Sequence, residues 1–257
     1  MRVRIGTAGW SIPRALSDRC AGGGTHLQRY ASVMDAVEIN SSFYRPHLER
    51  TYTKWADSTP AHFRFAVKLP GTITHELRLR QPARIAPLLR RFVGEISGLG
   101  AKLGPVLVQV PPSLEFDLRI ATRFFDLLRS MLTSTVVFEP RHATWFSDRA
   151  TDVLVRNEVA RVAADPVRAT GADVPGGWPG LVYYRLHGSP RTYWSSYDEP
   201  YLAALARTLS RHAAEEVWVI FDNTASGAAL ENALQLSGMS ESWQPSCNHN
   251  SARTCSL

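Results

Sequence analysis

Residues 136–146 have the sequence VVFEPRHATWF, in which an apolar run ends abruptly in an acid, a guanidinium and an imidazole. The β-branched and aromatic residues at the start of this stretch predict a buried strand. The sudden polarity from Glu139 onward indicates that the carboxyl-terminal end of the strand opens into a functional site. We therefore expect other strands of the chain to end in polar residues at the same place.

Strand-like and helix-like segments alternate along the chain. Strands are predicted at residues 3–7, 36–40, 63–69, 105–110, 135–139, 160–165, 181–187 and 217–222. Amphipathic spacing predicts helices between most of them, with Thr25, Asp117 and Asp198 as expected N-caps. This alternation is typical of a TIM-barrel-like (β/α)8 fold in a single domain, and an open doubly wound sheet is the alternative.

Two stretches depart from the alternation. Residues 166–180 contain too many Pro and Gly residues for a helix, which predicts a loop between the sixth and seventh strands. After a last predicted helix at about residues 226–236, the composition turns to Ser, Asn and Gln without periodicity. We therefore expect a barrel domain over residues 1–237 and a disordered tail over residues 238–257.

The composition limits the classes of protein. A chain of 257 residues with 44% hydrophobic residues can bury one large core. The net charge of +6 comes almost wholly from arginine, because Lys54, Lys68 and Lys102 are the only lysines. Arginine suits the recognition of phosphate, carboxylate or nucleic acid, although a coding preference for arginine over lysine is the alternative explanation.

Cysteine usage and hydropathy indicate the compartment. The three cysteines, Cys20, Cys247 and Cys255, have no CxxC spacing, which disfavours a disulfide framework and a zinc knuckle. The first predicted strand begins near the N-terminus without an apolar targeting segment, and no apolar run approaches membrane-spanning length. We expect a cytoplasmic protein with no membrane partner.

Alternate residues of a strand face the same side, so each predicted strand end can be divided into two faces. On this basis Glu139 and Arg141 share one face of the fifth strand, and Arg185 and His187 share one face of the seventh. The active site of a barrel lies at the carboxyl-terminal ends of its strands. The set of polar residues predicted to converge there is Glu38, Asn40, Lys68, Gln109, Glu139, Arg141, Asp165, Arg185, His187 and Asp222.

Residue types suggest roles within this set. Glu139 and His187 are the first choices for proton transfer, because a carboxylate in a barrel mouth and an imidazole can both titrate near neutral pH. Lys68, Arg141 and Arg185 are expected to bind an anionic group. A self-contained ionic network is the alternative for any one of these residues. The other catalytic candidates are Glu38, Asp165 and Asp222, and the other substrate-binding candidates are Asn40, Tyr44, Gln109, His75, His142, Asn223 and Trp10.

Aromatic residues of the predicted loops are candidates for stacking on a sugar or base, and packing within the loops is the alternative. They are Trp10, Tyr44, Trp145, Tyr193 and Trp194. Asn223 and Ser226 precede the last predicted helix, whose N-terminus could receive an anion; simple N-capping is the alternative.

A divalent metal is a further alternative, although the sequence requires no cofactor. Carboxylates and imidazoles at barrel strand ends suit such an ion, but the chain has no HxH or HExxH spacing. The ligand candidates are His75, His142, His187, Glu38, Glu139, Asp165 and Asp222. Residues 22–24 are all Gly but lack the context of a nucleotide-binding loop, and Ser189 lacks the GxSxG motif of many hydrolases.

Several ordered motifs resemble those of the DUF72 (YecE-like) family. They are GTAGW at 6–10, EINSSFY at 38–44, FAVKLP at 65–70, ITH at 73–75, LGP at 103–105, QVPP at 109–112, EPRH at 139–142, YRLHG at 184–188 and DNT at 222–224. The resemblance runs from about residue 3 to 236 and departs after Gly238. It implies a TIM-barrel-like fold and implies no particular reaction.

The leading hypothesis is a barrel enzyme that acts on a small anionic or phosphorylated substrate by hydrolysis, lyase chemistry or isomerisation. The Arg excess and the loop aromatics support a nucleic-acid-binding or repair-like protein as the first alternative. A metal-dependent hydrolase using the same barrel face is the second.

Overall fold

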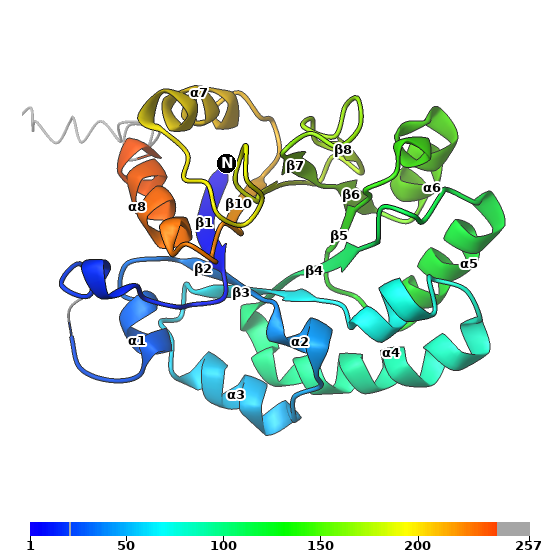
Figure 1. Cartoon of the computed structure of the whole chain (residues 1–257). Helices are drawn as coiled ribbons and strands as arrows, with labels where there is room; N and C mark the ends of the chain where they lie inside the picture. Colours follow the sequence, from blue (N-terminus) through cyan, green and yellow to red (C-terminus); the bar gives the residue numbers. More distant parts are fainter. Residues whose placement is uncertain (21, 241–257) are drawn as a thin grey trace, which may run out of the picture.

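The computed structural model describes residues 1–20 and 22–240, which form a ring of parallel strands surrounded by helices (Figure 1). The ring contains β1 (Arg2–Ala8), β2 (Ala36–Ile39), β3 (Arg64–Lys68), β4 (Leu103–Gln109), β5 (Val136–Glu139), β6 (Val159–Arg161), β7 (Ala163–Asp165), β9 (Leu181–Leu186) and β10 (Glu216–Phe221). Each of the eight predicted strands is present, the sixth being divided into β6 and β7. The TIM-barrel-like prediction is therefore confirmed.

The helices lie outside the ring and begin largely where the sequence predicted. They are α1 (His26–Tyr30), α2 (Ser41–Tyr44), α3 (Glu49–Asp57), α4 (Pro82–Ile96), α5 (Leu118–Arg129), α6 (Asp148–Arg156), α7 (Glu199–Leu209) and α8 (Ala228–Ser240), with shorter turns at Arg14–Leu16, Thr72–Glu76, Ser97–Lys102 and Ala143–Phe146. The side chains of Thr25, Asp117 and Asp198 accept hydrogen bonds from the first turns of α1, α5 and α7. These three caps satisfy backbone N–H groups that would otherwise have no partner.

The divided sixth strand closes the ring. β6 pairs in parallel with β5, and β7 pairs in parallel with β9. Only Val162 separates β6 from β7, and its N–H donates to the carbonyl of Phe138. One chain segment therefore bridges β5 and β9, which excludes the open doubly wound sheet.

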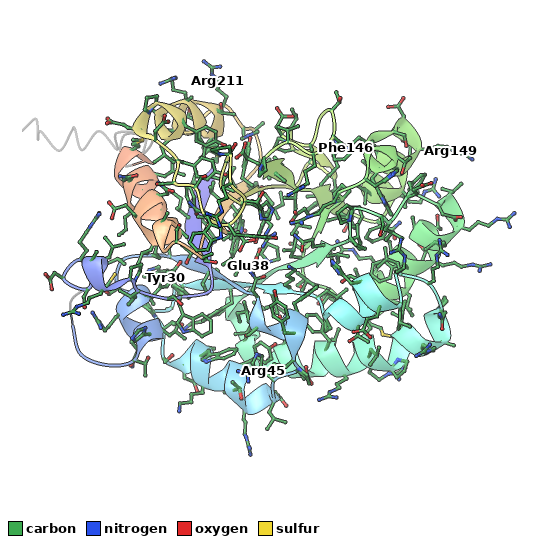
Figure 2. The ribbon with its side chains drawn as sticks, in the orientation of Figure 1. Tyr30, Glu38, Arg45, Phe146, Arg149 and Arg211 are labelled. Atoms are coloured by element: carbon green, nitrogen blue, oxygen red, sulfur yellow. The ribbon has the colours of Figure 1, made fainter. Side chains whose placement is uncertain are left out.

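Side chains on the two faces of the ring form two separate apolar clusters. The outer cluster lies between the strands and the helices and contains most of the buried apolar residues. The inner cluster contains small residues such as Ala36 and Ala66, together with the rings of Tyr183 and Trp218, which stack with centroids 6.0 Å apart. Figure 2 shows Glu38 near the middle of the ring.

The structure corrects some predicted boundaries. The predicted loop at 166–180 contains a short strand, β8 (Gly176–Gly177), which pairs antiparallel with β6. The last helix continues to Ser240, past the predicted domain boundary at residue 237. The rest of the predicted tail, with Cys247 and Cys255, lies outside the described residues. Among the helices of residues 1–20 and 22–240, none is long and apolar enough to span a membrane.

Candidate active site

Arg185 of β9 lies at the centre of the barrel and contacts carboxylates from three other strand ends. Its Nε and Nη2 donate to the two oxygens of Glu38 at 3.1 and 2.7 Å. Its Nη1 donates to Glu139 Oε2 at 2.7 Å, and Nη2 donates to Asp222 Oδ2 at 3.0 Å. The Arg185 side chain is fully buried. One guanidinium therefore joins the carboxyl-terminal ends of β2, β5 and β10.

Other side chains donate further hydrogen bonds to Glu38 and Glu139. Tyr183 Oη donates to Glu38 Oε2 at 2.9 Å, and Gln109 Nε2 donates to Glu139 Oε2 at 2.9 Å. Arg141 Nε donates to Glu139 Oε1 at 3.2 Å. We call the whole cluster the interior network; it comprises Glu38, Gln109, Glu139, Arg141, Tyr183, Arg185, His187 and Asp222.

His187 lies between two carboxylates. Its Nε2 is 3.0 Å from Glu139 Oε1, and its Nδ1 is 2.9 Å from Asp222 Oδ2. Burial would raise the pKa of both carboxyl groups, but Arg185 more than offsets it, so that the pKa of Glu139 lies well below its usual value and that of Asp222 is also lowered. Ionised carboxylates only accept hydrogen bonds, so the two contacts favour an imidazolium that donates from both nitrogens.

Lys68, at the end of β3, differs from the interior network because its amine has no polar partner. The residue is 8% exposed, and Nζ makes no hydrogen bond or ion pair with the described part of the chain. Nζ is not among the enclosed polar atoms that lack a partner, so it retains contact with solvent. Burial, followed by the positive charge of Arg185, lowers the pKa of Lys68 to about 8. A sizeable neutral fraction is therefore present near neutral pH.

The position of Lys68 is set by the motif that follows β2. Ser42 Oγ in α2 donates to the backbone carbonyl of Lys68 at 2.7 Å, which fixes α2 against the end of β3. The next residue, Phe43, places its ring centroid 4.3 Å from Lys68 Nζ and 4.9 Å from the His75 ring. A side chain at Gly71 would collide with the Phe43 ring at 2.9 Å, so glycine is needed there. The amine thus lies on an aromatic surface held by three sequence motifs.

Arg141 and Tyr193 lie beside the upper part of the interior network. The Arg141 side chain is 14% exposed, and its pKa is raised because Glu139 and Tyr193 outweigh the effect of burial. The Tyr193 ring packs edge-on against His187 with centroids 5.7 Å apart. The Tyr193 N–H donates to the carbonyl of His187, so the loop after β9 folds back over the site. These residues, with Lys68 and His75, surround the carboxyl-terminal end of the barrel.

Most residues of the predicted convergent set do converge. Strand parity placed them on the inner face, where they lie above the inner apolar cluster. They are Glu38, Lys68, Gln109, Glu139, Arg141, Arg185, His187 and Asp222. Sequence reasoning missed Tyr183 and Phe43. Tyr183 shares the parity of Arg185 and could have been included, whereas no signal marked Phe43 as the surface beneath Lys68.

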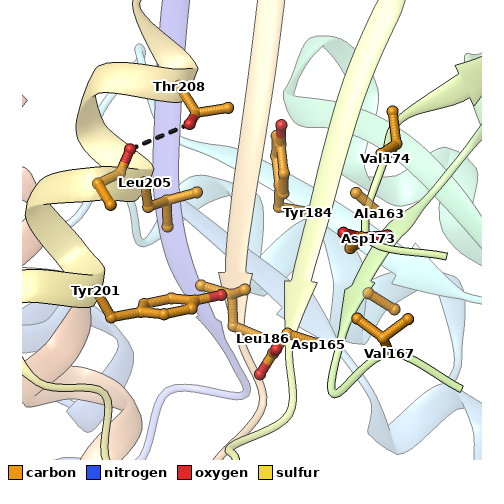
Figure 3. Close-up of a pocket in the computed structure, with 12 residues that line it drawn as sticks. Ala163, Asp165, Val167, Asp173, Val174, Tyr184, Leu186, Tyr201, Leu205 and Thr208 are labelled. Atoms are coloured by element: carbon orange, nitrogen blue, oxygen red, sulfur yellow. Dashed lines mark hydrogen bonds between the residues drawn. The ribbon is translucent and has the colours of Figure 1, made fainter. Parts of the chain in front are cut away.

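Asp165 was expected in this set, and the structure places it elsewhere. It pairs with Leu186 in the ladder between β7 and β9, on the outer face of the ring. Its Oδ1 accepts a hydrogen bond from Tyr197 Oη at 2.7 Å. As Figure 3 shows, Asp165 lines a cavity of about 410 Å³ with Leu186 and Tyr201, between the strands and α7. Asp165 therefore faces away from the interior network.

Several other predicted binding residues also lie apart from the network. Trp10 packs edge-on against Trp55 of α3, with centroids 5.1 Å apart, and lines a different cavity of about 730 Å³. His142 caps the turn at Ala143–Phe146 by accepting from the N–H of Thr144. Trp145, within this turn, is buried and donates from Nε1 to the Leu114 carbonyl, so the packing alternative is correct for it.

Asn40, Tyr44 and Asn223 follow the strand ends without contacting the interior network. Tyr44 is 81% exposed at the end of α2. Asn223 Nδ2 donates to the Ser195 carbonyl and to Asn232 Oδ1, which ties the loop after β9 to α8. The side-chain oxygens of Asn40 and Asn223 are enclosed and have no partner in the described residues.

The structure also corrects two expected roles. Arg185 was expected to bind an external anion, but its donors are directed at Glu38, Glu139 and Asp222. Glu139 was expected to titrate near neutral pH, but its pKa is low. Of the metal-ligand candidates, Asp165 and His142 lie outside the network, whereas Glu38, Glu139, His187 and Asp222 belong to it. Across residues 1–20 and 22–240, no group of three or more His, Cys, Asp or Glu side chains is arranged to hold a metal ion.

Sequence comparisons place the barrel among related proteins. The family model described as "Protein of unknown function DUF72" matches residues 4–253. The chain is 29% identical to the UPF0759 protein YecE of Escherichia coli K12 over 146 residues, which is 56% of this chain and 50% of YecE. It is 24% identical to the UPF0759 protein YunF of Bacillus subtilis over 91% of this chain and 93% of YunF. The match to YecE thus spans about half the length of that relative.

Solved structures share the fold. A DUF72 family protein from Enterococcus faecalis superposes with a TM-score of 0.78 at 23% identity, over 93% of this chain and 95% of that chain. A DUF72 family protein from Thermotoga maritima gives a TM-score of 0.74 at 26% identity, over 94% and 100%. A sugar phosphate isomerase/epimerase from Parabacteroides distasonis gives 0.54 at 12% identity, over 95% and 96%, which is a likeness of fold alone.

Proposed function

We propose that this chain, which belongs to the DUF72 family by a match over residues 4–253, is an enzyme. It would act on a small anionic substrate, such as a phosphorylated one, at the carboxyl-terminal end of the strands. One observation carries the proposal. Lys68 is a buried amine without a polar partner, beside a network in which every carboxylate is already paired. Burying a charge without a partner costs several kcal/mol, and a substrate anion would supply the missing partner.

The charge balance of the site supports an anionic ligand. With His187 as the imidazolium, four cationic side chains face three carboxylates in the barrel. The cations are Lys68, Arg141, Arg185 and His187, and the carboxylates are Glu38, Glu139 and Asp222. Arg185 is enclosed by its carboxylates, so Lys68 and Arg141 are the cations left to contact a ligand.

The acid/base role in this proposal belongs to His187 more than to Glu139. The ring of His187 carries a proton on each nitrogen, so it can give one to a substrate and take it back. Glu139 has a low pKa and acts as a fixed negative charge, held by Arg185, Arg141 and Gln109. Proton transfer next to a bound anion suits isomerisation or lyase chemistry, and hydrolysis is the other outcome.

A panel of small phosphates is the direct test. Inorganic phosphate, triose phosphates and pentose phosphates would be titrated into the protein by calorimetry; the sugar phosphates are included because one structural neighbour is titled a sugar phosphate isomerase/epimerase. We expect Lys68→Met and Arg141→Met each to weaken binding by about tenfold to a hundredfold, since a charge-assisted contact contributes about 1.5–3 kcal/mol.

Arg149→Met is the matched control, because Arg149 is an exposed arginine of α6 that extends away from the ring (Figure 2). Binding that is unchanged in the Lys68→Met protein would contradict the proposal. Salt-sensitive binding of single-stranded DNA that survives both barrel substitutions would instead favour the nucleic-acid alternative.

A further inference from the structure

We infer that Lys68 is the nucleophile of this site and forms an imine with the carbonyl carbon of an anionic aldehyde or ketone. The inference rests on the proposed function and narrows its substrate class. The supporting geometry is the partner-free amine at the end of β3, packed on the Phe43 ring and still in contact with solvent. An amine attacks through its lone pair, so a lysine whose protons are not held by acceptors suits this chemistry.

The two other lysines of the chain show how unusual Lys68 is. Lys102 Nζ donates to the carbonyls of Ala56 and Thr59, so its protons are held by acceptors. Lys54 is exposed on α3, where water stabilises the ammonium. At Lys68 the apolar face of Phe43 and the charge of Arg185 replace those stabilising groups. The lowered pKa of about 8 agrees with this geometry.

The bonds and protons of the reaction balance without an oxidant or a reductant. The Lys68 amine adds to the carbonyl carbon, the carbon–oxygen π bond opens, and a nitrogen proton moves to the oxygen. The resulting carbinolamine hydroxyl leaves as water after it takes one proton from the site, and the nitrogen lone pair forms the protonated imine. His187, which carries a proton on each ring nitrogen, is the candidate for that proton donor. The partly exposed guanidinium of Arg141 would pair with the anionic group of the substrate.

The bound carbonyl compound then has an electron sink at its imine. A protonated imine stabilises a carbanion at the neighbouring carbon, so proton loss or cleavage of a carbon–carbon bond becomes accessible. Of the reaction classes proposed above, this favours lyase chemistry or isomerisation through a carbanion, and it disfavours simple hydrolysis.

Reductive trapping tests the inference. The full-length protein would be incubated with pyruvate or dihydroxyacetone phosphate, reduced with borohydride and examined by intact mass and peptide mapping. We expect one stable adduct at residue 68, with labelling at exposed Lys54 lower by about tenfold or more, because an ordinary lysine is almost wholly protonated near pH 7.5. Lys102 should also react little, because its amine donates to the carbonyls of Ala56 and Thr59. Labelling should rise with pH through about 8.

Lys68→Arg separates the inference from the proposed function. Arginine keeps the positive charge but does not form this imine, so we expect phosphate binding to persist within about threefold while the adduct disappears. A melting curve close to that of the original protein would show that the variant is folded. Lys68-dependent phosphate binding with no adduct, or equal labelling of all three lysines, would overturn the imine and leave the proposed function standing. If the original protein shows neither phosphate binding nor an adduct, both the imine and the proposed function are overturned.

Discussion

Two polar clusters contain carboxylates from strand ends of this barrel, and they differ in the groups that pair with those carboxylates. Inside the ring, Glu139 is paired with cations, chiefly Arg185. Outside it, Asp165 is held by the neutral hydroxyl of Tyr197 and lies beside a cavity. We call the latter the flank cluster; it comprises Asp165, Tyr197 and Tyr201. The comparison shows that the face of the sheet decides whether a strand-end carboxylate needs a cation or only a hydrogen-bond donor.

The physical reason is access to water. Glu38 and Glu139 are almost completely enclosed, and an ion in such a place loses its hydration unless a charge replaces it. Asp165 is only partly buried and opens onto the cavity, so one good hydrogen bond is enough. We therefore expect substitutions in the interior network to have large effects on stability, and substitutions in the flank cluster to have small ones.

Arg185→Met should show the largest effect. It would leave three buried carboxylates without their common cation, so we expect the free energy of unfolding to fall by about 3–5 kcal/mol. Urea unfolding at pH 7, followed by fluorescence, measures this. Arg149→Met on the exposed surface of α6 should change stability by no more than about 0.5 kcal/mol. Equal losses of stability in the two variants would contradict the expected difference between the interior network and the exposed surface.

Lys68→Met should act in the opposite direction at neutral pH. Because burial and Arg185 lower the pKa of Lys68 to about 8, the folded chain releases this proton more readily than the unfolded chain does. The charged amine therefore costs stability below about pH 8, and stability recovers as the pH rises toward the ordinary lysine value of about 10.4. We expect the variant to be more stable by up to about 3 kcal/mol at pH 7 and the gain to vanish near pH 10.5. Lys54→Met, at an exposed lysine of α3, is the control and should show no such gain. A Lys68→Met protein that is less stable than the original at pH 7 would contradict the conclusion that the buried ammonium of Lys68 costs stability.

Glu139→Gln should cost about 2 kcal/mol at pH 7, because the amide keeps the shape but loses charge-assisted hydrogen bonds. A carboxyl group with a depressed pKa contributes stability above its unfolded value of about 4.3, and the contribution is lost as the pH falls toward the folded value. The difference between the two proteins should therefore shrink below about pH 4. Unfolding curves between pH 3 and 7 measure it. A difference that stays constant over this range would mean that folding does not lower the pKa of Glu139.

Tyr197→Phe should show the smallest effect, about 1 kcal/mol. The hydroxyl donates to Asp165 and accepts from the N–H of Gly188, and both bonds are lost. The matched control is Tyr201→Phe, because the Tyr201 ring stacks on Tyr197 with centroids 4.5 Å apart and its hydroxyl makes no hydrogen bond with residues 1–20 or 22–240. Thermal melts at pH 7 compare the two, and a loss as large as that for Arg185→Met would contradict the proposed order.

Strand positions and inner faces were predictable because the period of two in strands such as 136–139 is a local property of the sequence. The error at Asp165 has a simple origin. Ala160 and Val162 belong to the inner cluster, so residue 165 has the opposite parity and faces outward. Asp165 was grouped with Gln109 because both end a predicted strand. The alternation of inner and outer residues along the sixth strand was not counted, so Asp165 was assigned to the wrong face.

The partners of the inner residues were not predictable in the same way. Lys68 and Arg185 are both cations at strand ends, and the sequence does not distinguish them. Which one is enclosed by carboxylates depends on the register of β2, β5, β9 and β10 and on the reach of each side chain around the ring. Such contacts join residues up to 147 positions apart, as between Glu38 and Arg185, so no local pattern encodes them.

The divided sixth strand has a mechanical consequence. β6 pairs with β5, and β7 with β9, through three residue pairs each, whereas β1 and β10 share six. Amide hydrogens near Val162 should therefore exchange with deuterium before those of β1. The ion pair between Arg185 on β9 and Glu139 on β5 spans this joint. The pair that lies beside the candidate site therefore also holds the two halves of the barrel together, and local opening at the joint should be slowest when the pair is intact.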